Sequence, residues 1–177
     1  MPVGVLGEVR RQALKKISDS LQENVHELKN ILHADKNFDL IYREQKLGDK
    51  DAGFFFIDGF IKDTIMERLL KSFSDLKDTD IPANAGEFSD KYIPYVEVDL
   101  LDDVEDIVTA VLSGVACYFV DGYSECMAID CRTYPMRSVD EPWKDRVLRG
   151  SRDGFVETIV SNVALIRRRI RDPRLCV

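Results

Sequence analysis

The chain has 177 residues and a net charge of -7, and 45% of its residues are hydrophobic while 32% are charged. This length and balance predict one globular domain with its own core, and they exclude a disordered chain and a disulfide-stapled miniprotein. The first residues, MPVGVLGEVRRQALKK, lack the apolar region of a signal peptide, and no apolar run is long enough to span a bilayer. The sequence therefore fits a reduced, cytosolic setting, in which the cysteines are buried thiols rather than metal ligands: Cys117, Cys126, Cys131 and Cys176.

The hydrophobic pattern predicts helices and strands in mixed order along the chain. Helices are expected over residues 8–33, 61–76, 86–92, 101–114 (with Asp102 as N-cap) and 151–171 (stopped by Asp172-Pro173). Strands are expected over 38–47, 54–60, 95–99, 115–120 and 125–132, the last two forming a hairpin around an Asp-Gly turn. An irregular connection is expected over 133–150. The predicted class is α/β, with α+β as the alternative: a single domain over 1–177, with a mixed sheet of about four strands and four main helices.

Groups that carry catalysis are hard to find in this sequence. His26 and His33 lie seven positions apart on the first predicted helix, and without a third ligand they indicate surface residues. The acidic residues at 102–106 indicate a solvated helix start rather than an acid/base pair. Neither a Walker loop nor a dinucleotide fingerprint is present. The sequence thus predicts a protein that is not an enzyme and has no metal or cofactor.

Basic residues concentrate near the end of this acidic chain. Residues 140–177 hold nine basic and six acidic side chains, a local charge of +3, so residues 1–139 carry -10. Arg167, Arg168 and Arg169 fall in the last turns of the final helix, where they complement the helix dipole and pair with acidic residues of the remainder. The alternative is a basic contact surface for another protein segment or for anionic lipid. Nucleic acid is disfavoured by the acidic total charge.

The segment before the final helix offers a second candidate site. In RGSRDGF (149–155), Arg149 and Arg152 flank a glycine at a loop-to-helix junction, where backbone N–H groups can approach an anion. The simpler interpretation is a plain helix start capped by Ser151 or Asp153. Trp143, the single tryptophan, either anchors an interface or covers the sheet.

The same segment carries a resemblance to a known family. DEPWKDRVLRGSRDGFVETIVSNVALIRRRIRDPRL (140–175) resembles a signature shared by the A-subunit (GerA) family of bacterial spore germinant receptors. FFFIDGFIKD (54–63), KYIPYVEVD (91–99), VLSG (111–114) and RTYP (132–135) look most like the stage V sporulation branch of that family. The resemblance covers nearly the whole chain from about residue 38.

The resemblance implies a function that composition alone does not reach. Family members are expected to have a large N-terminal region of two α/β subdomains on the cytoplasmic, spore-core side, followed by helices in the spore inner membrane. They oligomerise, take part in ion release during germination, and are not enzymes. This chain would correspond to the first subdomain, without the second subdomain or the membrane helices. Its expected partners are the remainder of its own protein, other copies and other germination subunits. A free-standing α/β module that binds an anion or small ligand at RGSRDGF is the alternative.

Overall fold

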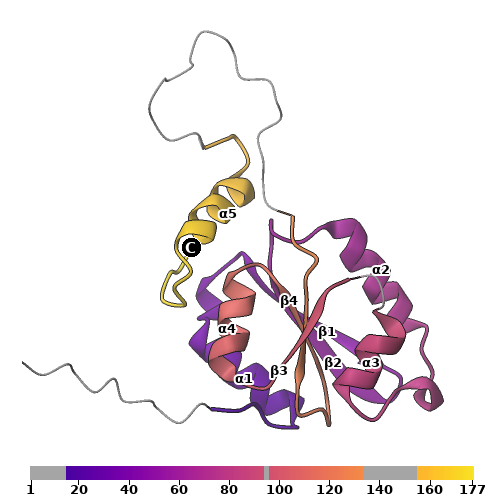
Figure 1. The fold of residues 1–177 in the computed structure, drawn as a ribbon. Helices are drawn as coiled ribbons and strands as arrows, with labels where there is room; N and C mark the ends of the chain where they lie inside the picture. Colours follow the sequence, from indigo (N-terminus) through magenta and orange to yellow (C-terminus); the bar gives the residue numbers. More distant parts are fainter. Residues whose placement is uncertain (1–14, 94–95, 134–154) are drawn as a thin grey trace, which may run out of the picture.

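A computed structural model of the protein describes residues 15–93, 96–133 and 155–177 (Figure 1). These residues form an α+β fold, the alternative that accompanied the α/β prediction. Its sheet has five strands: β1 (Leu40–Leu47), β2 (Lys50–Ile57), β3 (Val98–Leu101), β4 (Ala116–Val120) and β5 (Cys126–Ile129). Its described α-helices are α1 (Leu21–Ile31), α2 (Asp63–Ser74), α3 (Ala85–Tyr92), α4 (Val104–Leu112) and α5 (Ile159–Arg169). Two short 3-10 helices lie between them: η1 (Ala34–Lys36) and η2 (Asp78–Asp80).

The expected mixed sheet of about four strands is corrected to a five-stranded sheet in the order β1-β2-β4-β5-β3, in which every neighbouring pair is antiparallel. The helix α4 connects β3 to β4, and these two strands do run parallel. However, β5 lies between them and pairs with both. The second strand of the β4–β5 hairpin thus replaces one parallel pairing by two antiparallel ones.

Both hairpins turn at glycines with positive φ, a conformation that L side chains rarely adopt. The β1–β2 hairpin turns at Gly48 (φ 57°), and the β4–β5 hairpin turns at Gly122 (φ 85°) within the predicted Asp-Gly turn. In the second turn, the Tyr123 amide donates to the Val120 carbonyl at 3.1 Å. The predicted hairpin is therefore confirmed.

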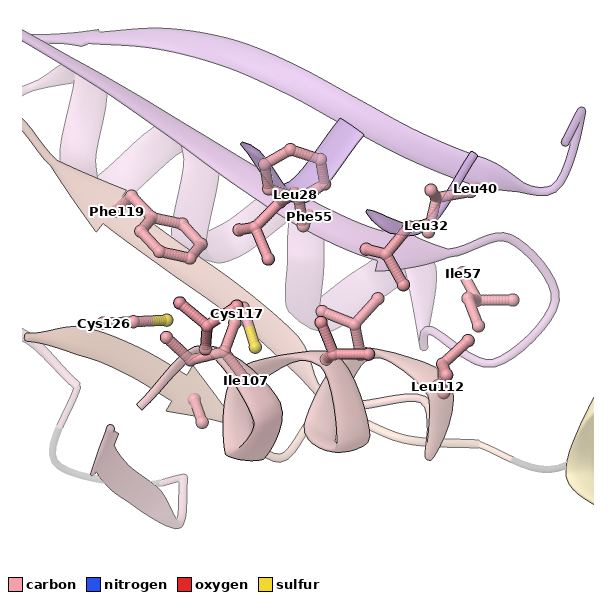
Figure 2. Packing of buried hydrophobic residues seen from close by; sticks show 14 of the residues in the cluster. Leu28, Leu32, Leu40, Phe55, Ile57, Ile107, Leu112, Cys117, Phe119 and Cys126 are labelled. Carbon is pink, nitrogen blue, oxygen red and sulfur yellow. The ribbon is translucent and has the colours of Figure 1, made fainter. Parts of the chain in front are cut away.

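Helices cover both faces of the sheet, with α1 and α4 on one side and α2 and α3 on the other (Figure 1). Neighbouring residues of β2 point to opposite faces, so Phe55 joins the α1/α4 core while Phe54 joins the α2/α3 core. Figure 2 shows the first core, where Phe55 and Phe119 lie near Leu28 and Ile107. The central strands are buried on both faces, which explains their continuous apolar runs, FFFI and ACYFV.

The first helix begins later than predicted, at Leu21 rather than residue 8. Ser20 is its N-cap, and the Ser20 hydroxyl accepts from the Glu23 amide. The residues just before Ser20 are extended instead: the Ile17 amide donates to the Asp102 carbonyl, and the Val104 amide donates to the Lys15 carbonyl, both at 2.9 Å. The hydrophobic periodicity therefore extends past the true start of the helix, because the backbone pairing of residues 15–17 with residues 102–104 sets that start. The rest of the predicted range, 8–14, lies outside the described residues.

The last helix is also shorter than predicted, and it buries a different face. Residues 155–158 are not helical, and the Asn162 side chain bonds both the amide and the carbonyl of Val156, at 2.7 and 2.6 Å. The three- to four-residue spacing of apolar residues in the sequence predicts a buried face made of Phe155, Ile159, Val163, Ile166 and Ile170. Of these, Val163 alone is buried, and the other two buried residues of α5 are Ala164 and Arg167. The predicted face is therefore wrong, because a polar contact sets the orientation of the helix.

Candidate functional site

The candidate arginines are divided between the inside and the outside of the fold. Arg167 has 2% of its side chain exposed, whereas Arg168 and Arg169 lie on the exposed side of α5. The remaining candidates, Arg149, Arg152 and Trp143, lie outside the described residues, as does most of RGSRDGF. Their assignment to an interface or an anion site stays a prediction.

Arg167 makes a buried, two-pronged ion pair with Asp39, 128 positions away in the sequence. Its Nη2 donates to Asp39 Oδ1 at 2.8 Å, and its Nε donates to Asp39 Oδ2. The Asp39 side chain is 1% exposed, so the pair is removed from water on both sides. A planar guanidinium matches a carboxylate in this fork geometry, which a lysine cannot reproduce.

A short network extends this ion pair to the end of α1 and to the tail after α5. Arg167 also donates to Asn37 Oδ1 at 2.8 Å and to the Leu175 carbonyl at 3.3 Å. Asn37 in turn donates to the Leu32 carbonyl at 2.9 Å, at the end of α1, and accepts from the Val177 amide at 2.9 Å. The start of β1, the end of α1, the helix α5 and the tail after it therefore meet at one buried polar centre.

A glycine beside this centre allows α5 to approach closely. Gly59 follows β2 with φ +83°, and a Cβ added there would lie 2.9 Å from Val160 Cγ1 and 3.4 Å from Ala164 Cβ. Ala164 and Val160 are on the same side of α5 as Arg167, one and two turns before it. These two residues and the arginine thus form one face, which sequence reasoning could have found from their spacing of three to four.

The contacts of this centre connect parts of the fold that are distant in the sequence. They join a guanidinium to its paired carboxylate, to an amide side chain and to a backbone carbonyl. Asp39 and Asn37 were missed by sequence reasoning, because a single acidic residue near the start of a predicted strand resembles an ordinary surface residue. No local pattern connects it to an arginine in the last helix.

A groove of about 500 Å³ lies elsewhere, between α1 and the β1–β2 hairpin. Tyr42 forms part of its lining, and the Lys29 ammonium lies 4.9 Å from the centre of the Tyr42 ring. Burial, and next the negative charges of Glu44 and Asp51, raise the pKa of Tyr42 to about 12. The hydroxyl of Tyr42 is therefore a neutral hydrogen-bonding group at ordinary pH.

Other predicted residues lie where the sequence placed them or close by. His26 is exposed on α1 and is 3.1 Å from the Asn30 side chain, while His33 follows α1 with a left-handed φ of 49°. No group of three potential metal ligands occurs within the described ranges. Asp103 rather than Asp102 is the N-cap of α4, and Asp103 accepts from the Glu105 amide at 2.8 Å.

The predicted burial of the cysteines holds for three of the four. Cys117, Cys126 and Cys131 are buried and free, while Cys176 is exposed in the tail. Burial raises the pKa of the Cys131 thiol to about 11. Within the part of the chain that the structure describes, no helix combines the length and the apolar character needed to cross a bilayer.

Comparison with known proteins assigns the chain to a class. The sequence profile described as "Bacillus/Clostridium GerA spore germination protein" matches residues 26–177. The chain therefore belongs to the GerA family of spore germination proteins, as its signature indicated. None of the names of the relatives reported below denotes an enzyme.

Individual relatives come from Bacillus subtilis (strain 168). The chain is 35% identical to stage V sporulation protein AF over 162 residues, which is 88% of this chain and 32% of that protein. It is 28% identical to spore germination protein KA over 165 residues (91% of this chain, 30% of that protein). Its identity to spore germination protein B1 is also 28%, over 166 residues (92% and 34%). The chain thus spans about a third of the length of these relatives.

A solved structure has the same fold. It is the N-terminal domain of the A subunit of the Bacillus megaterium spore germinant receptor GerK3, with a TM-score of 0.70 and 22% sequence identity. The match covers 93% of this chain and 60% of that one. At this identity the match concerns the fold alone.

Proposed function

We propose that this chain is the N-terminal part of a spore germination membrane protein and that it contributes to assembly or to ion release in response to a germination signal. The observation that carries the proposal is the family match over residues 26–177. The full-length protein resides in the spore inner membrane, with this part on the cytoplasmic, spore-core side. The chain itself catalyses no reaction; it supplies a folded platform.

The partners in this proposal are the remainder of the same polypeptide, other copies of it, and other germination subunits. The outward side of α5 is the proposed contact surface, because it combines Arg168 and Arg169 with exposed apolar groups. Ile159 is 65% exposed and Ile170, just after α5, is 47% exposed, so both side chains are accessible to a partner. The surrounding local charge of +3 favours an acidic partner surface.

A germination assay in the native spore-forming organism tests the function. Spores that lack the gene should release monovalent cations more slowly after germinant addition, and the native gene should restore the rate. Normal cation release from the deletion spores, under every germinant that the parent strain answers, would refute a role in germination.

The location of the contact surface needs a separate comparison. Arg168→Gln and Arg169→Gln should lower thermal stability more in the longer native polypeptide than in this chain, because a partner surface is present there alone. Lys46→Gln, on the distant β1–β2 hairpin, serves as the matched control. Equal effects of the arginine substitutions in both contexts would contradict the proposed surface.

A further inference from the structure

The two hydrophobic cores are formed almost entirely by the sheet and the helices α1 to α4, and α5 contributes little to them. In the core that lies under α1 and α4, Ala164 is the sole fully buried member from α5. The end of β5 closes onto the turn after β2 without help from α5: the Lys62 amide donates to the Cys131 carbonyl at 3.0 Å, and the Thr133 amide donates to the Phe60 carbonyl at 2.6 Å. Residues 15–93 and 96–133, here called the body, are therefore a nearly complete folding unit.

The remainder, residues 155–177, has few apolar contacts of its own. This segment, here called the strap, contains α5 and the tail after it. Its buried apolar side chains are Val163 and Ala164, while Phe155 is 71% exposed. In Figure 1 the strap lies at one end of the sheet, beside the body rather than between its layers. Apolar burial alone is a weak hold for a segment of this length.

Polar contacts join the strap to the body at defined points. The Arg167–Asp39 pair and Asn37 connect α5 to the body. Two hydrogen bonds of the Val177 backbone hold the tail. In these bonds the Val177 amide donates to Asn37 Oδ1 at 2.9 Å, and the Phe38 amide donates to the Val177 carbonyl at 3.4 Å. A buried ion pair of this kind adds little net stability when intact, yet the loss of one partner leaves a buried charge that the fold tolerates poorly. The body can relieve that cost by releasing the strap into water.

We propose that the strap docks on the body and detaches from it as a unit, with the Arg167–Asp39 pair as its latch. Detachment uncovers a site on the body with Asp39 and Asn37 at one end and the Gly59 notch at the other. Because a fork-shaped guanidinium matches the carboxylate, and Ala164 and Val160 lie against Gly59, this site recognises a helix with an arginine, an alanine one turn before it and a valine two turns before it. The same chemistry accepts the α5 of a second copy of this chain. The strap is thereby a releasable connection between the body and the segment that α5 contacts. This proposal does not depend on the proposed function.

Hydrogen exchange on the full chain tests the unit character of the strap. Arg167→Met keeps the aliphatic stem but leaves Asp39 without its cation, so protection in α5 should fall by about 100-fold or more. Protection in β2 and β4 should stay within about threefold of the wild-type value, because the body remains folded when the strap detaches as a unit. Lys46→Met, which removes an exposed ion pair with Asp51, should change neither region. A parallel loss across the body would show that α5 is integral to one cooperative unit, and unchanged protection in α5 would show that the pair is no latch; either result overturns the proposal.

A peptide in trans tests what the vacated site recognises. A labelled peptide of residues 155–177 should bind the full-length Arg167→Met chain saturably and the wild-type chain at least tenfold more weakly, because the wild-type strap occupies the site. The same peptide with Arg167→Met should not bind measurably to either chain. Equal binding of the two peptides, or binding of neither, would overturn the assignment of the site to an arginine-bearing helix.

Discussion

Replacement of Gly59 by alanine tests how closely α5 must approach the body. The backbone of Gly59 has φ +83°, and an added Cβ would lie 2.9 Å from Val160 Cγ1, closer than real Cβ contacts come. Two costs therefore combine: a left-handed conformation for an L-residue, and displacement of α5 from its seat. The second cost exists only if α5 occupies this position in solution.

A second glycine separates the two costs. Gly122 has a nearly identical φ of +85°, but a Cβ added there would meet Lys50 Nζ at 3.2 Å, the far end of a flexible side chain. Each alanine substitution should lower the unfolding free energy by about 1–2 kcal/mol through the left-handed backbone. Gly59→Ala should lower it by about 1–3 kcal/mol more, the usual range for overpacking a close contact.

Urea unfolding of the two variants measures this difference, and hydrogen exchange locates it. For Gly59→Ala we expect the larger loss of unfolding free energy and a loss of protection in α5. Gly122→Ala should lose protection mainly around the β4–β5 turn. Equal losses from the two substitutions would refute the close packing of α5 on Gly59, and with it the position of the strap.

Three further outcomes follow from burial and capping. Cys176 is exposed and should react at once with a thiol reagent. The buried thiols should react only as fast as the protein opens: Cys117, Cys126 and Cys131. Burial raises the pKa of Tyr42 and of Tyr123 to about 12 from the ordinary 10.0, so their contribution to stability is complete below pH 10 and is lost as the pH rises to about 12. Tyrosinate absorbance during an alkaline titration measures this, and titration of all tyrosines near their ordinary pKa before unfolding would contradict it. Asp103→Ala removes the cap of α4 and should lower the unfolding free energy by about 1 kcal/mol in urea titrations; no loss would mean that the cap is dispensable.

Sequence reasoning recovered elements whose causes are local. The Asp-Gly pair at 121–122 fixed the β4–β5 hairpin, because a glycine there accepts positive φ. The run FFFI marked a buried strand, which lies in the centre of the sheet with helices on both faces. These features depend on a few neighbouring residues, so a single sequence contains them.

The features that were wrong or missed depend on distant parts of the chain. The insertion of β5 between β3 and β4 is a pairing choice that neither strand's own pattern reveals. The late start of α1 depends on the backbone contacts of residues 15–17 with residues 102–104. The ion pair of Arg167 with Asp39 spans 128 positions, and its carboxylate lies at the start of the predicted strand 38–47, where no local pattern indicates a distant partner. The hydrophobic periodicity favoured the isoleucines of α5 as its buried face. The orientation of the helix is set instead by Arg167, because a buried arginine that does not reach its carboxylate is strongly destabilising.

The arginine run at 167–169 is therefore not one surface. Consecutive helix positions point about 100° apart, so one of three neighbouring arginines at most can face the body, and Val163 and Ala164, four and three positions earlier, place Arg167 there. Arg169 donates to the Leu165 carbonyl at 3.2 Å, where a cation complements the end of a helix. A variant with all three arginines neutralised would release the strap as well as alter its outer side, and it would report undocking as if it were loss of a partner. Arg168→Gln and Arg169→Gln, made with Arg167 intact, are the substitutions that separate contact with a partner from attachment to the body.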